Sequence, residues 1–334
     1  MSLHPALIFL GGLVVIVLGA ELLLRGATRL ASLLGVPPVI IGLTVVTAGT
    51  TMPELAVGVT AALEGQSGLA VGNIAGTNIF NILVILGLSA AVRPIPLRLL
   101  SFKLDVPVMI GAALTLIFMA WDGVLTRTDG VLLLIAAASY TLALMLLSRR
   151  ESSAVRREFA EEFGRDTVAA GPDDTLPRSR WARGTLYLGL LAAGIAVTLL
   201  GAELLVSGAV SLARDFGVSD EIIGLTIVAV GTSAPELATT LVATIRNERD
   251  VAIGNLAGSC IYNILVILGV TSLVSEGGVA VARDVLWIDL PLAAGVAVLL
   301  LPVFRSGDSV SRREGGLFLS LYGLYLASLL LWRI

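Results

Sequence analysis

Histidine and cysteine are almost absent from this chain of 334 residues, which contains one of each, His4 and Cys260. A single cysteine excludes a disulfide framework within the chain. One histidine near the start offers no evident general base, and no Ser/His or paired-aspartate arrangement stands out. The sequence also has no Rossmann or P-loop glycine fingerprint, which argues against a nucleotide-driven pump. We therefore expect neither an enzyme nor a bound cofactor.

Charged residues are scarce as well, at 14% of the chain, against about 25% in a soluble domain. Hydrophobic residues make up 56%, and the mean hydropathy is +0.95. A helix needs about 20 apolar residues to cross a membrane, and no segment alternates like the strand of a membrane barrel. The sequence therefore predicts an all-α integral membrane protein with ten transmembrane helices, at 5–23, 38–62, 68–91, 104–121, 130–148, 184–206, 216–244, 251–273, 285–304 and 315–332.

The few basic residues are distributed unevenly over the loops between these segments. With the N-terminus outside, the inward side receives 18 of the 22 Lys and Arg residues and the outward side receives 4. Cytoplasmic loops of membrane proteins carry such an excess. We therefore expect a multi-pass protein of the cell (inner) membrane, with both termini extracytoplasmic and a cytoplasmic linker at 149–183.

The chain contains an internal repeat. Residues 19–90 align with residues 201–272 without a gap, and 37 of the 72 positions are identical. Because each copy contributes five helices, an odd number, the two copies must enter the membrane with opposite orientations. Secondary transporters with such inverted repeats bind their substrate near the midplane, where discontinuous helices meet. The two five-helix repeats are assigned to 1–148, with its core at 38–91, and to 184–334, with its core at 216–273.

Two matching stretches, "GTTMPE" at 49–54 and "GTSAPE" at 231–236, place a proline and a glutamate inside apolar segments. Proline has no N–H for the carbonyl four residues earlier, so Pro53 and Pro235 are expected to break or kink their helices. Irregular backbone at membrane depth is tolerated only where protein or water covers it. Glutamates inside a membrane are functional by default, so Glu54 and Glu236 are the leading candidates for an ion site.

Further oxygen-bearing side chains recur around these glutamates at helical spacing. Thr50 and Thr232 each precede a glutamate by four residues, on the same helical face. Four residues also separate the members of two further pairs, Thr77 with Asn81 and Ser259 with Asn263. Oxygen-only sites suit Ca²⁺, Mg²⁺, Mn²⁺ or Na⁺, and Ca²⁺ takes about six to eight oxygens. Mg²⁺ is the least suitable because it dehydrates reluctantly.

The charge of the two glutamates predicts exchange rather than leak. They balance one divalent ion or two monovalent ions. An empty site would carry two negative charges, and each charge at the bilayer centre costs at least about 2.5–3.5 kcal/mol. The empty site should therefore resist exposure to the other side of the membrane, whereas the neutralised site can switch from one side to the other. A passive channel is less consistent with this charge, and no "TVGYG"-type filter is present.

The paired motifs, each followed by "GNIAGTNIFN" or "GNLAGSCIYN", resemble the two α-repeats of the Na⁺/Ca²⁺ exchanger family within the calcium:cation antiporter superfamily, in its prokaryotic type. The resemblance covers nearly the whole chain. It implies alternating access by sliding of the first and sixth helices past the others. It also implies ion ligation by side chains, with backbone carbonyls near Thr47 and Ala229, and the implied side chains are Glu54, Glu236, Asn81, Thr50, Thr232, Thr77 and Ser259.

Two positions depart from the family pattern. In similar prokaryotic exchangers the position of Asn263 can be an aspartate, so this chain carries one possible negative charge fewer at the candidate metal-binding position. Cys260 stands where the other repeat has Asn78. The amide puts a three-Na⁺ stoichiometry in question and leaves Asn263 as a neutral oxygen ligand.

The function expected from these residues and this resemblance is a secondary active antiporter that exchanges Ca²⁺ for Na⁺. The alternative on the same scaffold is an exchanger of H⁺ for Ca²⁺ or another divalent cation, because two glutamates can cycle two protons against one Ca²⁺. The expected partners are the transported Ca²⁺ and Na⁺ (or H⁺) and the lipid bilayer, with no nucleic acid. The oligomeric state is left open.

Four further acidic residues recur in both halves. Glu21 and Glu203 each follow "GA" near the end of a span, and we expect them to serve an interface or a structural ion pair. Asp105 and Asp289 lie just inside span ends, where we expect helix caps or interfacial positions.

Overall fold

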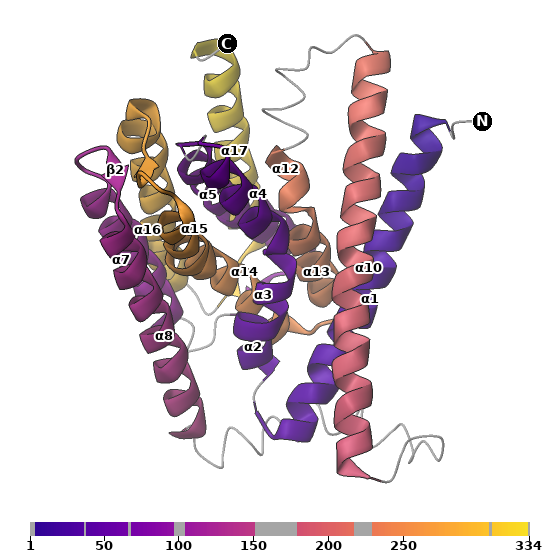
Figure 1. The fold of residues 1–334 in the computed structure, drawn as a ribbon. Coiled ribbons are helices and arrows are strands. Elements are labelled where there is room, and N and C mark those ends of the chain that lie inside the picture. The colour runs from indigo at the N-terminus through magenta and orange to yellow at the C-terminus, as the bar shows by residue number, and fades with distance from the viewer. Residues whose placement is uncertain are drawn as a thin grey trace.

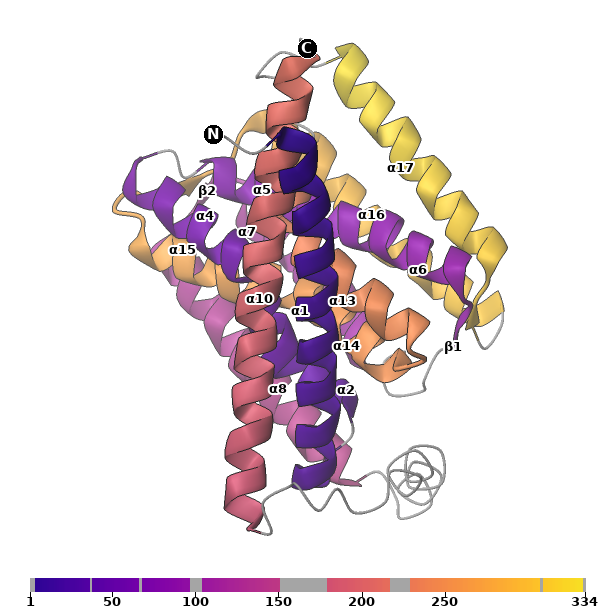
Figure 2. The ribbon, with the colours of Figure 1, turned by 90° about the vertical axis from the view of Figure 1, so that its right-hand side faces the viewer.

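The computed structural model describes residues 4–36, 38–65, 68–96, 104–150, 179–216, 229–306 and 309–332. Helices dominate these ranges, and the strands of the described chain form two short antiparallel pairs. In Figures 1 and 2, the long helices α1 and α10 lie side by side along one flank of a bundle of shorter helices. Most of the predicted linker, at 151–178, lies outside the described residues.

The described part of the first half contains eight α-helices, four of which directly adjoin one of two π-helices. Its elements are α1 (Pro5–Leu34), α2 (Pro38–Ile41), a π-helix (Gly42–Val46), α3 (Thr47–Thr50), α4 (Met52–Leu63), α5 (Gly68–Phe80), a π-helix (Asn81–Leu86), α6 (Gly87–Val92), β1 (Ile95–Pro96), α7 (Val106–Met119), β2 (Val124–Leu125) and α8 (Arg127–Arg150).

The second half repeats this order. Its described elements are α10 (Arg180–Asp215), α12 (Ala229–Thr232), α13 (Ala234–Ile245), α14 (Arg249–Tyr262), a π-helix (Asn263–Leu268), α15 (Gly269–Val274), β3 (Val279–Ala280), a π-helix (Val285–Asp289), α16 (Leu290–Ser306), β4 (Ser309–Val310) and α17 (Arg312–Trp332).

Six described helices are long and apolar enough to cross a membrane, and α4, α7 and α13 are shorter apolar helices. The helical, membrane-spanning character that the sequence predicts is therefore confirmed, whereas the count of ten spans stays a prediction. The six long helices coincide with six of the predicted spans and comprise Pro5–Leu34, Gly68–Val92, Arg127–Leu146, Trp181–Asp215, Arg249–Val274 and Val285–Val303.

Helices α1 and α10 pack against each other through glycines at seven-residue spacing. A Cβ atom on Gly12 would overlap the backbone of Leu205, and one on Gly26 would overlap the backbone of Leu191. The two helices are therefore antiparallel and in backbone contact, as small residues allow in membranes. The glycines that make this contact are Gly12, Gly19 and Gly26 on α1 and Gly194, Gly201 and Gly208 on α10.

These two helices are also longer than the sequence predicts. With 30 and 36 residues, α1 and α10 measure about 45 and 54 Å at 1.5 Å per residue. Both exceed the hydrocarbon core of a bilayer, which is about 30 Å thick. The pair therefore forms one continuous rod, and Figure 2 shows it in front of the remaining helices.

The short strands join the two halves crosswise. β1 pairs with β4 through Ile95 and Val310, and β2 pairs with β3 through Val124 and Ala280. In the repeat, β1 corresponds to β3 and β2 corresponds to β4. Each pairing is therefore the counterpart of the other with the halves exchanged, which is the relation that an internal two-fold axis requires.

The aspartates Asp105 and Asp289 are buried, and each accepts a hydrogen bond from a tyrosine. Tyr140 donates to Asp105 over 2.8 Å, and Tyr325 donates to Asp289 over 3.4 Å. Asp105 precedes α7 but makes no side-chain capping bond. The expectation of a cap is therefore wrong for Asp105, because a tyrosine 35 residues further along the chain supplies the donor. The equivalent tyrosine lies 36 residues after Asp289, and an interfacial position of the two aspartates stays a prediction.

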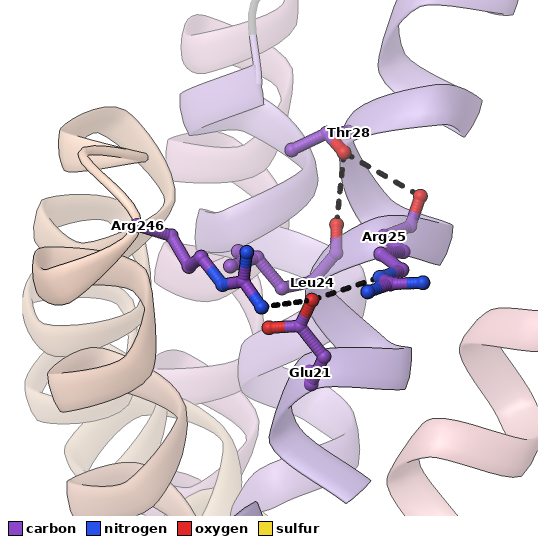
Figure 3. Close-up of polar contacts among 5 residues, drawn as sticks. All are labelled: Glu21, Leu24, Arg25, Thr28 and Arg246. Atoms are coloured by element: carbon purple, nitrogen blue, oxygen red, sulfur yellow. Dashed lines mark hydrogen bonds and ion pairs between the residues drawn. The ribbon is translucent and has the colours of Figure 1, made fainter. Parts of the chain in front are cut away.

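Glu21 forms the ion pairs that the sequence predicts for it (Figure 3). Its Oε1 lies 2.8 Å from Nε of Arg25 on the same helix and 2.8 Å from an Nη atom of Arg246, at the end of α13. This contact joins the rod of α1 and α10 to the rest of the bundle. Glu203 is exposed, and no ion pair is found for it within the described ranges, so the ion pair of Glu21 has no counterpart there and an interface role of Glu203 stays a prediction.

The glycine contacts predict the effect of a single methyl group. Gly201→Ala should destabilise the protein by about 1–3 kcal/mol, because the new Cβ would overlap the backbone of Ile16. Thermal unfolding in detergent measures this loss of stability. Gly189→Ala on the same helix is the matched control, since a Cβ atom at Gly189 meets no atom within 4 Å. Equal unfolding temperatures for the two variants would contradict the close packing of α1 and α10.

Candidate cation site between the two halves

The site is built around two breaks in helices. α3 ends at Thr50 and α4 begins at Met52, with Pro53 in its first turn; α12 ends at Thr232 and α13 begins at Ala234. The residues between them, Thr51 and Ser233, leave helical geometry with ψ angles of 8° and 5°. The breaks predicted from the prolines are therefore confirmed, each one residue long.

Each break places a glutamate in the first turn of the following helix. Glu54 is 0% exposed and Glu236 is 1% exposed. The N-terminus of a helix carries a partial positive charge that favours a carboxylate. The two carboxylates are close enough to repel each other, so the fold brings together the pair that the sequence singles out.

Hydroxyl groups from one half face the carboxylate of the other. Ser233 donates a hydrogen bond to Oε1 of Glu54 over 3.4 Å, and Thr232 lies against the same carboxylate. Thr50 lies against the carboxylate of Glu236. Neither half alone supplies both a carboxylate and its neighbouring hydroxyls, so the site exists only where the halves meet.

The two carboxylates have no basic partner within the part of the chain that the structure describes. Neither carboxylate takes part in an ion pair there, and the neighbours of both are hydroxyls, backbone amides and the other glutamate. Oε2 of Glu54 and both carboxylate oxygens of Glu236 are buried without a hydrogen-bond partner. A buried charge that is neither paired nor hydrogen-bonded is costly, so this arrangement requires cations or protons.

The predicted amide and hydroxyl ligands on α5, α14 and the π-helices that follow are buried beside one another. The side chains of Thr77, Asn81, Ser259 and Asn263 are at most 4% exposed. Polar atoms of all four are buried without a hydrogen-bond partner in the described structure. Such orphaned oxygens are the donors that a hard cation would use.

Cys260 and its counterpart Asn78 make the two halves chemically different at this point. The amide of Asn78 donates to the carbonyl of Cys260 over 3.1 Å and accepts from the amide of Asn263 over 3.0 Å. The thiol of Cys260 lies beside Asn81. The amide oxygen of Asn263 is left without a partner, so Asn78 turns this residue to present its oxygen rather than its N–H₂ group.

The family resemblance implies two backbone carbonyl ligands, Thr47 and Ala229, and the structure shows the hydrogen bonds of the first. The carbonyl of Thr47 already accepts from the backbone of Thr51 over 3.0 Å and from the hydroxyls of Thr51 and Thr50 over 2.8 and 3.3 Å. It is therefore occupied in this conformation. Ala229 begins α12, and its carbonyl ligand role stays a prediction.

Sequence reasoning missed three residues that take part in the site or surround it, namely Ser233, Asn78 and Asn255. Ser233 aligns with Thr51, so a hydroxyl occurs in both copies, and Asn255 aligns with an identical residue, Asn73. The alignment of the two repeats could therefore have pointed to Ser233 and Asn255. No group of three or more His, Cys, Asp or Glu side chains fit to hold a metal occurs among the described residues.

The whole chain apart from its middle matches one protein family. The family model described as sodium/calcium exchanger protein matches residues 4–146 and 186–331. The unmatched segment between them corresponds closely to the predicted linker. The inner membrane protein YrbG of Escherichia coli K12 is 37% identical over 289 residues, which are 85% of each chain. CaxA of Alkalimonas amylolytica is 37% identical over 323 residues, covering 92% of this chain and 93% of that protein.

The fold matches solved exchanger structures. A structure of the sodium-calcium exchanger NCX_Mj soaked with 2.5 mM Na⁺ and 1 mM Sr²⁺ superposes with a TM-score of 0.80 at 29% identity. The match covers 98% of this chain and 99% of that one.

The buried glutamate pair predicts that either single neutral substitution removes Ca²⁺ binding. Glu54→Gln and Glu236→Gln each take away half the negative charge that offsets the desolvation of a divalent ion, so affinity should fall by at least about 100-fold, in line with the loss of a charged hydrogen-bonding group. Calcium titration of purified protein by calorimetry measures this. Glu203→Gln, an exposed carboxylate, is the control, and unchanged affinity in either site variant would refute the assignment.

Proposed function

The chain belongs to the sodium/calcium exchanger protein family, and from this premise we propose that it exports Ca²⁺ in exchange for Na⁺. It is a membrane-embedded cation antiporter rather than an enzyme. The observation that supports the finer proposal is the facing pair Glu54 and Glu236, one from each half, buried without a basic partner in the described chain. One Ca²⁺ or two Na⁺ would neutralise this pair.

The charge of the site accounts for obligatory exchange. Exposing the empty site to the other side would move two uncompensated carboxylates through a low-dielectric region, which is strongly unfavourable. Loading with Ca²⁺ or with Na⁺ removes that barrier. The protein would therefore change conformation only when loaded, and neither ion would leak alone.

The architecture proposed for this cycle is ten transmembrane helices in two inverted five-helix repeats. The antiparallel contact of α1 with α10 and the crosswise strand pairs support it. The seven-residue glycine contacts favour movement of α1 and α10 as one rod. Its sliding past α3, α12 and α13 would open the site to one side and then to the other.

The proposed site comprises the two glutamates together with the hydroxyl and amide groups around them. Asn263 contributes a neutral oxygen, so the negative charge of the site is limited to two. The ligands proposed for the transported ions are Glu54, Glu236, Asn81, Asn263, Thr50, Thr232, Thr77, Ser259 and Ser233, with the carbonyls of Thr47 and Ala229 joining after rearrangement.

The proposed location is the inner membrane, with both termini extracytoplasmic and the segment 149–183 in the cytoplasm. The relative YrbG is named an inner membrane protein, and the asymmetric distribution of Lys and Arg supports the orientation. In this orientation α13 and α14 meet at the cytoplasmic side, through Asn247 and Glu248.

Transport into proteoliposomes tests the coupling ion. Vesicles loaded with Na⁺ and diluted into Na⁺-free buffer should accumulate ⁴⁵Ca²⁺, whereas vesicles with an outward proton gradient and no Na⁺ should not. The outward Na⁺ gradient drives Ca²⁺ entry only if both ions use the same site. Uptake driven by the proton gradient alone would replace Na⁺ by H⁺ in the proposal, and Ca²⁺ flux without any counter-ion would contradict exchange.

A further inference from the structure

Asn255 on α14 links the site to a hydroxyl that lies outside it. Its side chain is 0% exposed. The amide oxygen accepts a hydrogen bond from the hydroxyl of Thr50 over 3.3 Å, and the amide nitrogen donates to the hydroxyl of Thr240 over 3.1 Å. Asn255 therefore spans from a predicted ligand, Thr50, to a residue one turn beyond Glu236 on α13.

The direction of the Thr50 hydroxyl proton decides whether its oxygen is available to a cation. A hydroxyl has one proton and two acceptor lone pairs. Thr50 lies next to the Glu236 carboxylate, and a proton directed there would point at any cation bound to that carboxylate. Two other acceptors lie 3.3 Å from this hydroxyl, the side-chain oxygen of Asn255 and the carbonyl of Thr47. Donation to either turns the proton away and leaves a lone pair of the Thr50 oxygen for the ion, but only donation to Asn255 also leaves the Thr47 carbonyl without this bond.

Tight helix packing holds Asn255 in place. A Cβ on Gly258 would overlap the side chain of Thr47, and one on Gly42 would lie 3.4 Å from the backbone nitrogen of Asn255. α14 therefore runs against the segment that ends in Thr50 with little room to shift. Within this packing, the bond to Thr240 fixes which end of the amide faces Thr50, because the N–H₂ group is already engaged.

The first half lacks the corresponding arrangement. Asn73 aligns with Asn255, but Gly58 stands where the second half has Thr240. The amide nitrogen of Asn73 is buried and has no hydrogen-bond partner in the described structure. The two halves are thus unequal: one asparagine is oriented by a threonine and the other is not.

We propose that Asn255, held by Thr240, is a positioning residue that orients the Thr50 hydroxyl and thereby sets the Ca²⁺ affinity of the site. This inference rests on the proposed function, since it concerns the same ion. Neither Asn255 nor Thr240 touches the cation in this scheme. Their effect is on binding rather than on the rate at which a loaded protein changes conformation.

The test compares three substitutions on α13 in proteoliposomes. Thr240→Val keeps the shape of the side chain but removes the hydrogen-bond acceptor. It should raise the KM for Ca²⁺ about three- to tenfold, the equivalent of one hydrogen bond. The kcat should stay within about twofold of wild type, because the lost interaction affects ion binding and not the later step. Thr240→Ser restores the hydroxyl and should restore the KM. Thr244→Val is the control, because that hydroxyl is also buried but donates to the carbonyl of Thr240 within its own helix.

A second pair of variants compares the halves directly, by calorimetric Ca²⁺ titration of purified protein. Asn255→Ala should lower the affinity more than Asn73→Ala does. The inference is overturned if Thr240→Val leaves the KM unchanged, if Thr240→Ser fails to restore it, or if Asn73→Ala weakens binding as much as Asn255→Ala. Absence of Ca²⁺ exchange by the wild-type protein would instead overturn the proposed function, so the two failures are distinguishable.

Discussion

The structure depends on one electrostatic constraint, the burial of two carboxylates next to each other with no basic side chain beside them among the described residues. Glu54 and Glu236 come from equivalent turns of the two halves, and each faces hydroxyls of the opposite half. Proline-induced breaks allow helix N-termini to point at this place within an apolar bundle. Such a pair is costly to bury unless cations or protons occupy it, as the cation exchange of its family requires.

The rod of α1 and α10 packs directly on the helix breaks that carry the two buried carboxylates. The rod is internally tight, since six glycines bring the two backbones together. It packs on both helix breaks: Ile195 of α10 lies against Gly49 and Val206 lies against Gly231. The ion pair of Glu21 with Arg246 ties it to the end of α13. A stiff rod of this kind suits the proposed sliding of α1 and α10 as a unit past the candidate site.

The core of the candidate site could be predicted from the sequence, because the residues that are unfavourable inside an apolar helix are the same ones that recur in both halves. Pro53 and Glu54 recur as Pro235 and Glu236, so helix breaks and a shared carboxylate pair followed from local chemistry. The engaged carbonyl of Thr47, the tyrosine partners of Asp105 and Asp289 and the role of Asn255 did not follow, because each depends on which helices touch. Helix lengths were underestimated in α1 and α10 since polar residues such as Glu21 and Arg25 end an apolar run without ending the helix.

The most direct test of the central claim is a crystal structure of the protein grown with Ca²⁺, with anomalous diffraction data to locate the ion. The account predicts a Ca²⁺ peak between the two glutamates, with oxygens of both carboxylates about 2.3–2.6 Å away. The side chains of Thr50 and Ser259 should face the same peak. A peak bound by only one of the two glutamates, or no peak between them at saturating Ca²⁺, would contradict the claim that the two halves share one cation site.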